Sequence, residues 1–513
     1  MLVKTYSAAI TALQATTITI EVNLARGTSF HLSGLADTAV KESYDRIRAA
    51  IENNGFKAPT ADLTINMSPA DIRKEGSGYD LPLAIGILAA YHKVADDVLK
   101  DYMMVGELGL DGSLKPVSGV LSVAIRARKE KFKGLIVPKA NVREAAVVNQ
   151  LEVYGMDSIS EVISFLNGAE VYQPTMVDTR KEFYDHQYAY DLDFTDVRGQ
   201  ESVKRALEVA AAGGHNVILI GPPGSGKSMM AKRLPSILPP LSLAESLETT
   251  QIHSVAGILP SGTSLISQRP FRSPHHTISQ VAMTGGTQKA QPGEVSLAHN
   301  GVLFCDELPE FSRATLEVLR QPLEDRKITI SRAKYTIEYP CSFMFVASMN
   351  PCPCGYYGDP THQCVCTPGQ IQRYMNRISG PLLDRMDLHI EVPVVPFNQL
   401  SQMQPGESSG VIRARVIAAR KRQEERFATF KGVYCNAQMT ERMIHQFCQP
   451  DEQSLDMLRT AMDRLHLSAR AYNRILKVAR TIADLDGWER IQGVHIAEAI
   501  GYRNLDRDDW GER

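Results

Sequence analysis

GPPGSGKS at residues 221–228 decides the fold of the central part of this chain. It matches the pattern G-x-x-x-x-G-K-[ST], in which backbone N–H groups at the start of a helix surround a phosphate group. The apolar run 217–220 before it predicts a buried strand, and the stretch 229–234 after it predicts a helix. This order indicates a nucleotide-binding α/β domain, in which Lys227 reaches the β- and γ-phosphates of ATP and Ser228 holds Mg²⁺. The alternative is a Gly/Pro turn that matches by chance. The residues expected to contact the nucleotide are Gly221, Pro222, Pro223, Gly224, Ser225, Gly226, Lys227 and Ser228.

Two further apolar runs end in polar residues that suit hydrolysis. The run 302–305 ends in Asp306 and Glu307, and the run 343–349 ends in Asn350. We expect Asp306 to bind Mg²⁺, directly or through water, and Glu307 to orient and activate the attacking water. Asn350 is placed to contact the γ-phosphate or that water. Because a protein that only binds nucleotide needs no counterpart of Glu307, the pattern predicts an ATP hydrolase.

Length and composition limit the remaining possibilities. A chain of 513 residues should hold about three domains, and its 43% hydrophobic content is ordinary for globular proteins. The net charge of −2 means that any DNA binding must use a local basic surface. The longest apolar stretch, 81–91, is too short to span a bilayer, and no secretory signal is evident at the N-terminus. Eight cysteines in a chain of this length do not suggest a disulfide scaffold, so we expect a cytoplasmic protein.

The chain divides into four parts by pattern. Residues 1–170 alternate strand-like and helical stretches and predict an α/β domain, whereas 171–195 have no clear period and predict a linker. Residues 196–396 hold the nucleotide motifs, and 397–513 show the apolar spacing of helices. In the first part we expect strands at 18–22 and 63–67 and helices at 40–53 and 120–131.

The order of several longer motifs points to one family. These are DVRGQ at 196–200, AAAGGHNVILIGPPGSGKS at 210–228, FRSPHHTIS at 271–279, GEVSLAHNGVLFCDELPEF at 293–311, MNPCPCG at 349–355 and SGPLLDRMDLHIEVP at 379–393. Over nearly its whole length the chain resembles the magnesium-chelatase-like AAA+ ATPases of bacteria, specifically the ComM/YifB proteins. The resemblance implies an AAA+ P-loop core followed by a C-terminal helical lid.

The same resemblance implies a ring, usually a homo-hexamer, with ATP between subunits. Arg385 then corresponds to the arginine finger, which a neighbouring subunit supplies to neutralise charge on the transferring phosphoryl group. The alternative is a surface ion pair with Asp384 or Asp387. Arg470 corresponds to the lid arginine that senses nucleotide, with Arg474 as a competing assignment and a solvated helix arginine as the alternative.

The first 170 residues resemble the peptidase domain of Lon. The similarity lies in PADIRKEGSGYDLPLAIGIL at 69–88 and VGELGLDGSLKPVSGVLSVAIRA at 105–127. Lon peptidases use a serine nucleophile with a lysine base. In this chain the serine position falls on Gly78 and the lysine position on Leu121, and Ser77 is one residue out of register. We therefore expect a scaffold or nucleic-acid-docking domain without the Ser–Lys dyad.

Residues 327–339 alternate as two strands of a hairpin with Ser331-Arg332-Ala333-Lys334 as the turn. In related ring ATPases such a hairpin projects into the central channel, so Arg332 and Lys334 are candidates to contact DNA phosphates. An exposed turn with ordinary surface charges is the alternative. The arginine-rich stretch 413–426 is a second candidate basic surface, although Glu424 and Glu425 also allow a solvated helix face.

Four cysteines form C-x-C-x₉-C-x-C between Asn350 and Arg385. Two close pairs of thiolates can complete a tetrahedral Zn²⁺ site, so Cys352, Cys354, Cys364 and Cys366 predict zinc, with His362 as a substitute ligand. The alternative is four reduced thiols in a loop.

Three functions remain open from the sequence. The ComM/YifB resemblance implies an ATP- and Mg²⁺-dependent motor on single-stranded or branched DNA that drives branch migration in recombination and natural transformation, together with other recombination proteins. The second is the ATPase motor of a metal-inserting chelatase, against which the Lon-like domain and the cysteine cluster argue. The third is an ATP-dependent protease, against which the missing dyad argues.

Overall fold

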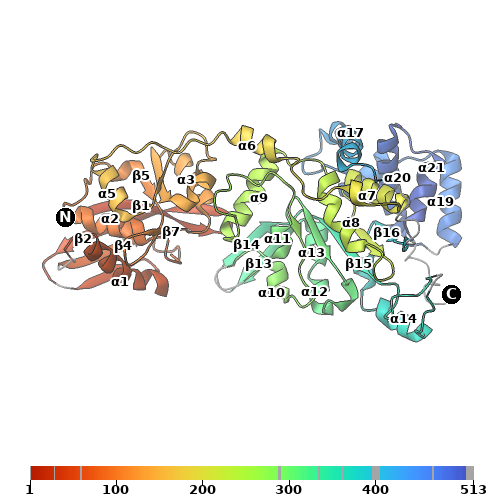
Figure 1. Ribbon diagram of the computed structural model, residues 1–513, viewed down its shortest axis with the longest axis horizontal. Helices are drawn as coiled ribbons and strands as arrows, with labels where there is room; N and C mark the ends of the chain where they lie inside the picture. The colour runs from red at the N-terminus through yellow and green to blue at the C-terminus, as the bar shows by residue number, and fades with distance from the viewer. Residues whose placement is uncertain are drawn as a thin grey trace. The chain divides into compact units, whose positions relative to one another are not determined.

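Figure 1 shows the computed structural model of the chain, which describes residues 2–27, 29–57, 61–286, 290–332, 335–359, 362–395, 405–464 and 467–503. The contacts between residues divide the chain into two compact units. The first unit comprises Met1–His186, Leu243–Ser267 and Ala290–Pro292, and the second comprises Gln187–Ser242, Gln268–Lys289 and Gly293–Arg513. Among the described residues, no helix is both long enough and apolar enough to cross a membrane.

The first unit is built on a mixed seven-stranded sheet. Its strand order is β3-β4-β2-β1-β5-β8-β9, antiparallel around β1 and β2 and parallel from β1 to β9. The strands are β1 (Leu2–Thr11), β2 (Gln14–Ala25), β3 (Phe30–Ser33), β4 (Asp62–Ser68), β5 (Tyr102–Met104), β8 (Gly134–Pro138) and β9 (Glu152–Met156), with β6 (Glu107–Leu108) and β7 (Leu114–Lys115) pairing separately.

Helices cover both faces of this sheet. Successive side chains of β8 point to opposite faces, so that Ile136 joins one hydrophobic core while Leu135 and Val137 join the other. The first core includes residues of α1 and α2, and the second includes residues of α3 and α4. The helices are α1 (Thr38–Asn53), α2 (Asp80–Ala90), α3 (Val120–Lys129), α4 (Val142–Ala145), α5 (Ile159–Leu166) and α6 (Thr179–His186). The four elements expected from the sequence, β2, β4, α1 and α3, are all present.

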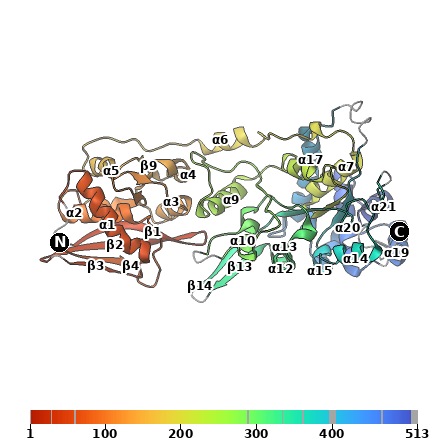
Figure 2. The ribbon, with the colours of Figure 1, turned by 60° about the horizontal axis from the view of Figure 1, so that its bottom comes forward.

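One helix of the first unit comes from a segment that lies between the nucleotide-binding motifs in the sequence. Helix α9 (Leu243–Val255) packs on α3, as Figure 2 shows. The Gln251 side chain donates hydrogen bonds to the carbonyl oxygen of Leu13 at 2.5 Å and to the hydroxyl of Ser122 at 3.0 Å. The Gly119 N–H donates to the Ser254 carbonyl oxygen at 2.9 Å. The segment Leu243–Ser267 thus belongs to the first unit, although it lies within the range 196–396 assigned to the ATPase core from the sequence.

The second unit contains a five-stranded parallel sheet of order β11-β12-β15-β10-β16. The strand before the phosphate loop, β10, lies in the interior and is fully buried, which explains its continuous apolar sequence. The strand β15 separates β10 from β12. The strands are β10 (Val217–Ile220), β11 (Phe271–Arg272), β12 (Val302–Cys305), β15 (Met344–Met349) and β16 (Leu388–Glu391).

The C-terminal helices share one core with this parallel sheet. Helices α17 and α20 both pack on α7, and Val416, Ile475 and Ala479 belong to the same buried cluster as Val217 and Leu219 of the sheet. The C-terminal helices are α17 (Ser409–Phe427), α18 (Glu441–Phe447), α19 (Glu452–Arg464), α20 (Ala469–Asp486) and α21 (Gly493–Gly501). The helices around the sheet are α7 (Glu201–Gly213), α8 (Lys227–Arg233), α10 (Gln280–Thr284), α11 (Glu294–Leu297), α12 (Arg313–Glu317), α13 (Arg320–Asp325), α14 (Pro368–Met375) and α15 (Gly380–Leu383).

The predicted hairpin is present as a separate antiparallel ribbon, β13 (Lys327–Arg332) with β14 (Tyr335–Pro340), which Figure 2 shows beside α13. Ile330 pairs with Ile337, and both side chains are buried. The two units therefore have the α/β architectures that the sequence predicts, and the second ends in a helical lid.

Candidate nucleotide site

The phosphate loop joins the carboxyl end of β10 to the start of α8. Gly224 and Gly226 have φ angles of +76° and +91°, which a residue with a side chain rarely adopts. A Cβ atom on Gly221 would lie 2.2 Å from the carbonyl oxygen of Val392. These three glycines let the loop turn tightly beside β16, and helix α8 begins at Lys227.

The Lys227 ammonium group lies inside this loop. It donates hydrogen bonds to two loop carbonyl oxygens, of Gly221 at 2.7 Å and Pro222 at 2.9 Å, and to the side-chain oxygen of Asn350 at 3.2 Å. Burial lowers the pKa of Lys227, and the negative charges of Asp306 and Glu307 oppose that shift. The cation is thus held beside Asn350, where phosphate oxygens are the natural acceptors for it.

The Ser228 hydroxyl donates to the Asp306 carboxylate at 2.7 Å. The other oxygen of this carboxylate accepts a hydrogen bond from the hydroxyl of Ser348, on the adjacent strand β15. Mg²⁺ prefers hard oxygen ligands and binds nucleotide sites through one or two protein oxygens plus phosphates. The Ser228–Asp306 pair fits that requirement, and Mg²⁺ bound there would neutralise charge on the phosphates.

Glu307 has an unusual backbone conformation. Its φ angle is +54°, a left-handed conformation that is uncommon for a residue other than glycine. The Glu307 N–H donates to the Asp306 side chain at 3.1 Å, and the Glu307 carboxylate is 60% exposed. His276, which follows β11, places its Nδ1 3.7 Å from that carboxylate. This turn presents the carboxylate outward at the tip of β12, where a substrate water can reach it.

The structure thus brings the predicted hydrolytic residues to one edge of the sheet. The strands β12, β15 and β10 are neighbours and run parallel, so their carboxyl ends lie side by side. The residues at that edge are Lys227, Ser228, Asp306, Glu307 and Asn350.

The predicted arginines lie elsewhere, around a cavity of about 420 Å³ that we call the amino-edge cavity. Arg385 donates to the Pro381 carbonyl oxygen at 2.7 Å and pairs with the carboxylate of Glu324. Its side chain is only 18% exposed. The remaining lining includes Asn216, Phe343, Arg470, Arg474 and Lys477.

Asp384 and Asp387 do not pair with Arg385, contrary to the alternative considered from the sequence. Arg470 contacts Asp384 at 2.9 Å, and Arg474 contacts Asp387 at 2.9 Å. Both competing lid arginines therefore line the same cavity as Arg385.

The amino-edge cavity and the phosphate loop lie at opposite edges of the parallel sheet. Asn216 directly precedes β10, Phe343 directly precedes β15 and Asp387 directly precedes β16. A four-residue strand such as β10 spans about 13 Å, which is longer than an arginine side chain. The Asn216 side chain also donates to the Arg385 carbonyl oxygen at 2.9 Å and so holds this arginine at the amino edge.

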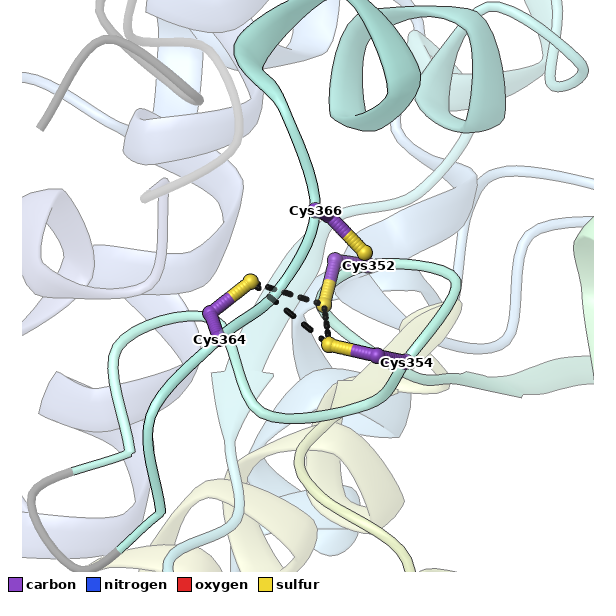
Figure 3. Close-up of side chains that lie close together, drawn as sticks. All are labelled: Cys352, Cys354, Cys364 and Cys366. Carbon is purple, nitrogen blue, oxygen red and sulfur yellow. Dashed lines mark hydrogen bonds between the residues drawn. The ribbon is translucent and has the colours of Figure 1, made fainter.

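The four predicted cysteine ligands lie together in the loop between β15 and α14. Their sulfur atoms are all within 4.8 Å of one another, and Figure 3 shows them gathered around a common point. Burial raises the pKa of Cys354, but the N–H groups of Tyr356 and Val365 and the neighbouring thiols outweigh it, so that the pKa falls to about 6. His362 instead stacks on Tyr356, with ring centroids 4.8 Å apart.

The two Lon-like positions, Gly78 and Leu121, both lie in the first unit. A Cβ atom on Gly78 would lie 3.8 Å from Val117, and Leu121 is fully buried in the core on the α3 side. Neither residue carries a nucleophile or a base. The nearby Ser77 hydroxyl is hydrogen-bonded to the Glu107 carboxylate, while the buried Lys74 ammonium donates to the Pro69 carbonyl oxygen.

Of the two basic regions predicted to contact DNA, only the stretch 413–426 has its side chains described by the structure. Lys334 lies outside the described residues, and the side chain of Arg332 at the end of β13 is also not described. The arginine-rich stretch 413–426 forms α17, and most of its arginines bind protein groups. Examples are Arg415 with Glu208 and Arg426 with Asp484. The structure thus favours a structural role for this stretch over a free basic surface.

The site contacts of three residues were not predicted from the sequence. Ser348 has a detectable signal, because it is a polar residue near the carboxyl end of β15, two residues before Asn350. His276 and Glu324 carry no such signal, since each meets its partner only through the tertiary fold.

Four features together define an ATPase of the AAA+ class. They are the phosphate loop after β10, the two acids at the end of β12, Asn350 at the end of the intervening strand β15, and the helical lid. Three family models match successive segments: "Magnesium chelatase, subunit ChlI" at residues 193–400, "Subunit ChlI of Mg-chelatase" at 20–141 and "Magnesium chelatase, subunit ChlI C-terminal" at 406–503. The chain belongs to the ComM/YifB family of magnesium-chelatase-like AAA+ ATPases.

Two relatives cover nearly the whole chain. Competence protein ComM of Haemophilus influenzae is 44% identical over 98% of this chain and 97% of its own length. The uncharacterized protein YifB of Escherichia coli is 45% identical over 96% of each chain. Lon protease 2 of Bacillus subtilis is 32% identical over 159 residues, which cover 28% of this chain and 27% of that protein. The Lon-like resemblance of the N-terminal α/β domain is thereby confirmed.

Proposed function

We propose that this chain hydrolyses ATP at the junctions between copies of itself in a ring, usually a hexamer, and uses that energy to drive branch migration of DNA. The observation that carries the proposal is the separation of the hydrolytic groups from the arginines. Glu307 lies at the carboxyl edge of the sheet, whereas Arg385 lies at the amino edge. A second copy that presents its amino edge to the first completes the site.

Within such a junction each group has a separate role. Lys227 and the loop N–H groups bind phosphate, and Glu307 accepts a proton from the attacking water while Asn350 orients it. Arg385 of the neighbouring copy neutralises the charge that develops on the transferring phosphoryl group. Arg470 lines the same cavity as Arg385, so we assign it to the same neighbouring site. A head-to-tail contact of this kind closes into a ring when the rotation between copies allows it.

Two features support DNA as the object that is moved. The relative from Haemophilus influenzae is named for competence, the state in which bacteria take up DNA. In the sequence, Arg332 and Lys334 lie where β13 gives way to β14, and two cations at that position suit a phosphate backbone without base specificity. The Lon-like unit serves as a scaffold or docking domain, because Gly78 and Leu121 stand at the two catalytic positions.

The test measures ATP turnover with and without a synthetic four-way junction, at several salt concentrations, together with separation of the junction into two duplexes. We expect turnover to rise with the junction and binding to weaken steeply with salt, because each neutralised phosphate releases a counterion. Arg332→Glu with Lys334→Glu should reduce the stimulation and keep basal turnover. Arg459→Glu with Arg464→Glu, on the exposed side of α19, is the matched control with the same change in charge.

The competing function is that of a chelatase motor, which the descriptions of the three matching family models favour. If basal ATP turnover is intact but the junction neither stimulates it nor separates, the DNA proposal is refuted. The chelatase function would then take its place.

A further inference from the structure

We propose that Cys352, Cys354, Cys364 and Cys366 form a structural zinc centre that holds the cysteine loop, residues 352–359 and 362–366, against the phosphate loop. The existence of the centre is independent of the proposed DNA function. Its effect on ATP rests on the nucleotide site described above.

All four sulfurs lie within 4.8 Å of one another, and three of them have spacings close to those of a zinc–thiolate site. The Cys352 and Cys354 sulfurs are 3.3 Å apart, and the Cys364 sulfur lies 3.7 Å from the first and 3.6 Å from the second. Zinc–sulfur bonds of about 2.3 Å in a tetrahedron place sulfurs about 3.8 Å apart. The observed separations lie slightly below that value and far above the roughly 2.0 Å of a disulfide bond.

The backbone of the loop is shaped around the sulfurs. Gly355 and Gly358 have φ angles of +88° and +78°, which let the chain turn back on itself after the first cysteine pair. The N–H of Tyr357 donates to the Cys352 sulfur at 3.3 Å, a contact that stabilises a thiolate. Four thiolates fill a tetrahedral zinc shell and leave no open position, which indicates a structural rather than a catalytic metal.

The cysteine loop bears directly on the nucleotide site. A Cβ atom on Gly355 would lie 2.6 Å from the Cδ of Pro223. The backbone of the cysteine loop at Gly355 therefore packs directly against the proline ring of the phosphate loop. Asn350, which contacts Lys227, is only two residues from Cys352 along the chain. Cys352 itself is fully buried. A metal that fixes this loop therefore fixes one side of the phosphate loop and the position of Asn350.

The first experiment measures metal in the full chain, purified under reducing conditions without added metal. We expect about one zinc per chain by elemental analysis, because one four-thiolate set binds one ion. Exchange with Co²⁺ should produce the intense near-ultraviolet absorption of sulfur-to-cobalt charge transfer and the visible bands of a tetrahedral site. Cys364→Ser with Cys366→Ser, both partly exposed, should abolish zinc and these bands, whereas the control Cys435→Ser with Cys448→Ser should keep both. Absence of zinc and of the cobalt spectrum from the wild-type chain would overturn the centre.

The second experiment measures the Kd of a fluorescent ATP analogue. Removal of zinc by a thiol-reactive mercurial and a chelator, followed by re-reduction, should raise that Kd about tenfold, and zinc should restore it. Gly355→Ala should raise the Kd while retaining one zinc, because it crowds Pro223 and leaves the four thiols in place. An unchanged Kd in both cases would overturn the coupling to the phosphate loop. A chain that holds zinc and binds ATP but ignores DNA would contradict only the proposed function.

Discussion

Mixing two inactive variants of this chain tests whether the amino-edge arginines act on a neighbouring copy. Arg385→Ala retains Glu307 and lacks the arginine, whereas Glu307→Gln retains Arg385 and lacks the carboxylate. Each variant alone should bind ATP and fail to hydrolyse it. Loss of an arginine finger lowers turnover by about 10³- to 10⁵-fold.

The placement of the two groups fixes the size of the recovery. Because Glu307 and Arg385 lie at opposite edges of the sheet, each junction takes one group from each copy. In a random equal mixture, half of the copies supply an intact Glu307 and half supply an intact Arg385. About one quarter of the junctions then hold both groups, whatever the number of copies in the ring. Recovery should follow the product of the two fractions and peak at equal mixing.

The assay is steady-state ATP turnover at constant total protein, measured across mixing ratios. Copurification of differently tagged variants confirms that mixed rings form. Arg459→Ala, an exposed arginine on α19, replaces Arg385→Ala in the control and should give a linear rather than a product dependence. If mixed rings form and no activity returns, or if Arg385→Ala alone turns over at the wild-type rate, the assignment in trans is wrong.

Four single substitutions have defined outcomes. Lys227→Ala should abolish ATP binding, whereas Glu307→Gln should keep binding and lower turnover by about 10²- to 10⁴-fold. Equilibrium binding of ATP and steady-state ATP turnover, measured for both variants, check this prediction. Glu324→Gln should raise turnover by up to about fivefold, because the ion pair with the exposed Glu324 carboxylate, worth at most about 1 kcal/mol, then no longer competes for Arg385. Asp387 has a pKa that burial would raise but that the hydrogen bond from His215 and the Arg474 charge lower. Its contribution to stability is therefore present above about pH 4 and is lost as the pH falls below it. Asp387→Asn should lower the free energy of unfolding at pH 7 by about 3 kcal/mol in urea titrations and weaken the acid dependence.

The Glu324 and Asp387 predictions each have a matched control variant. Glu441→Gln lines the same cavity and should leave turnover unchanged; an equal rise would contradict the competition for Arg385. Asp384→Asn removes a more exposed partner and should cost less stability than Asp387→Asn. Tight ATP binding by Lys227→Ala would show that the ammonium group is not a phosphate ligand.

The sequence predicted the central part of the site because its signals are local. Parallel strands buried on both faces are continuous apolar runs, so β10, β12 and β15 and the polar residues at their ends were found in advance. Glu324 and Arg385 are 61 residues apart in the chain, and no periodic pattern in the sequence predicts that their side chains form an ion pair.

The placement of α9 was hidden for a different reason. Its buried residues include Ser246, Thr249, Thr250 and Ser254. Because these side chains are polar, an analysis of hydrophobic periodicity predicts that they are exposed. The hydroxyl of Thr250 donates to the Ser246 carbonyl oxygen at 2.7 Å, and that of Ser246 donates to Ile266 at 2.6 Å. Hydroxyls satisfied in this way can be buried without an apolar stripe in the sequence.

The insertion of α9 also limits how this chain can be dissected. A gene shortened to begin after His186 would still encode Leu243–Ser267, whose packing partners, α3 and the turn at Leu13, would be gone. The remnant would expose a helix face rich in hydroxyl groups together with the side chains of Leu247 and Leu265. Removal of the peptidase-like unit therefore requires the deletion of at least two separate segments rather than one.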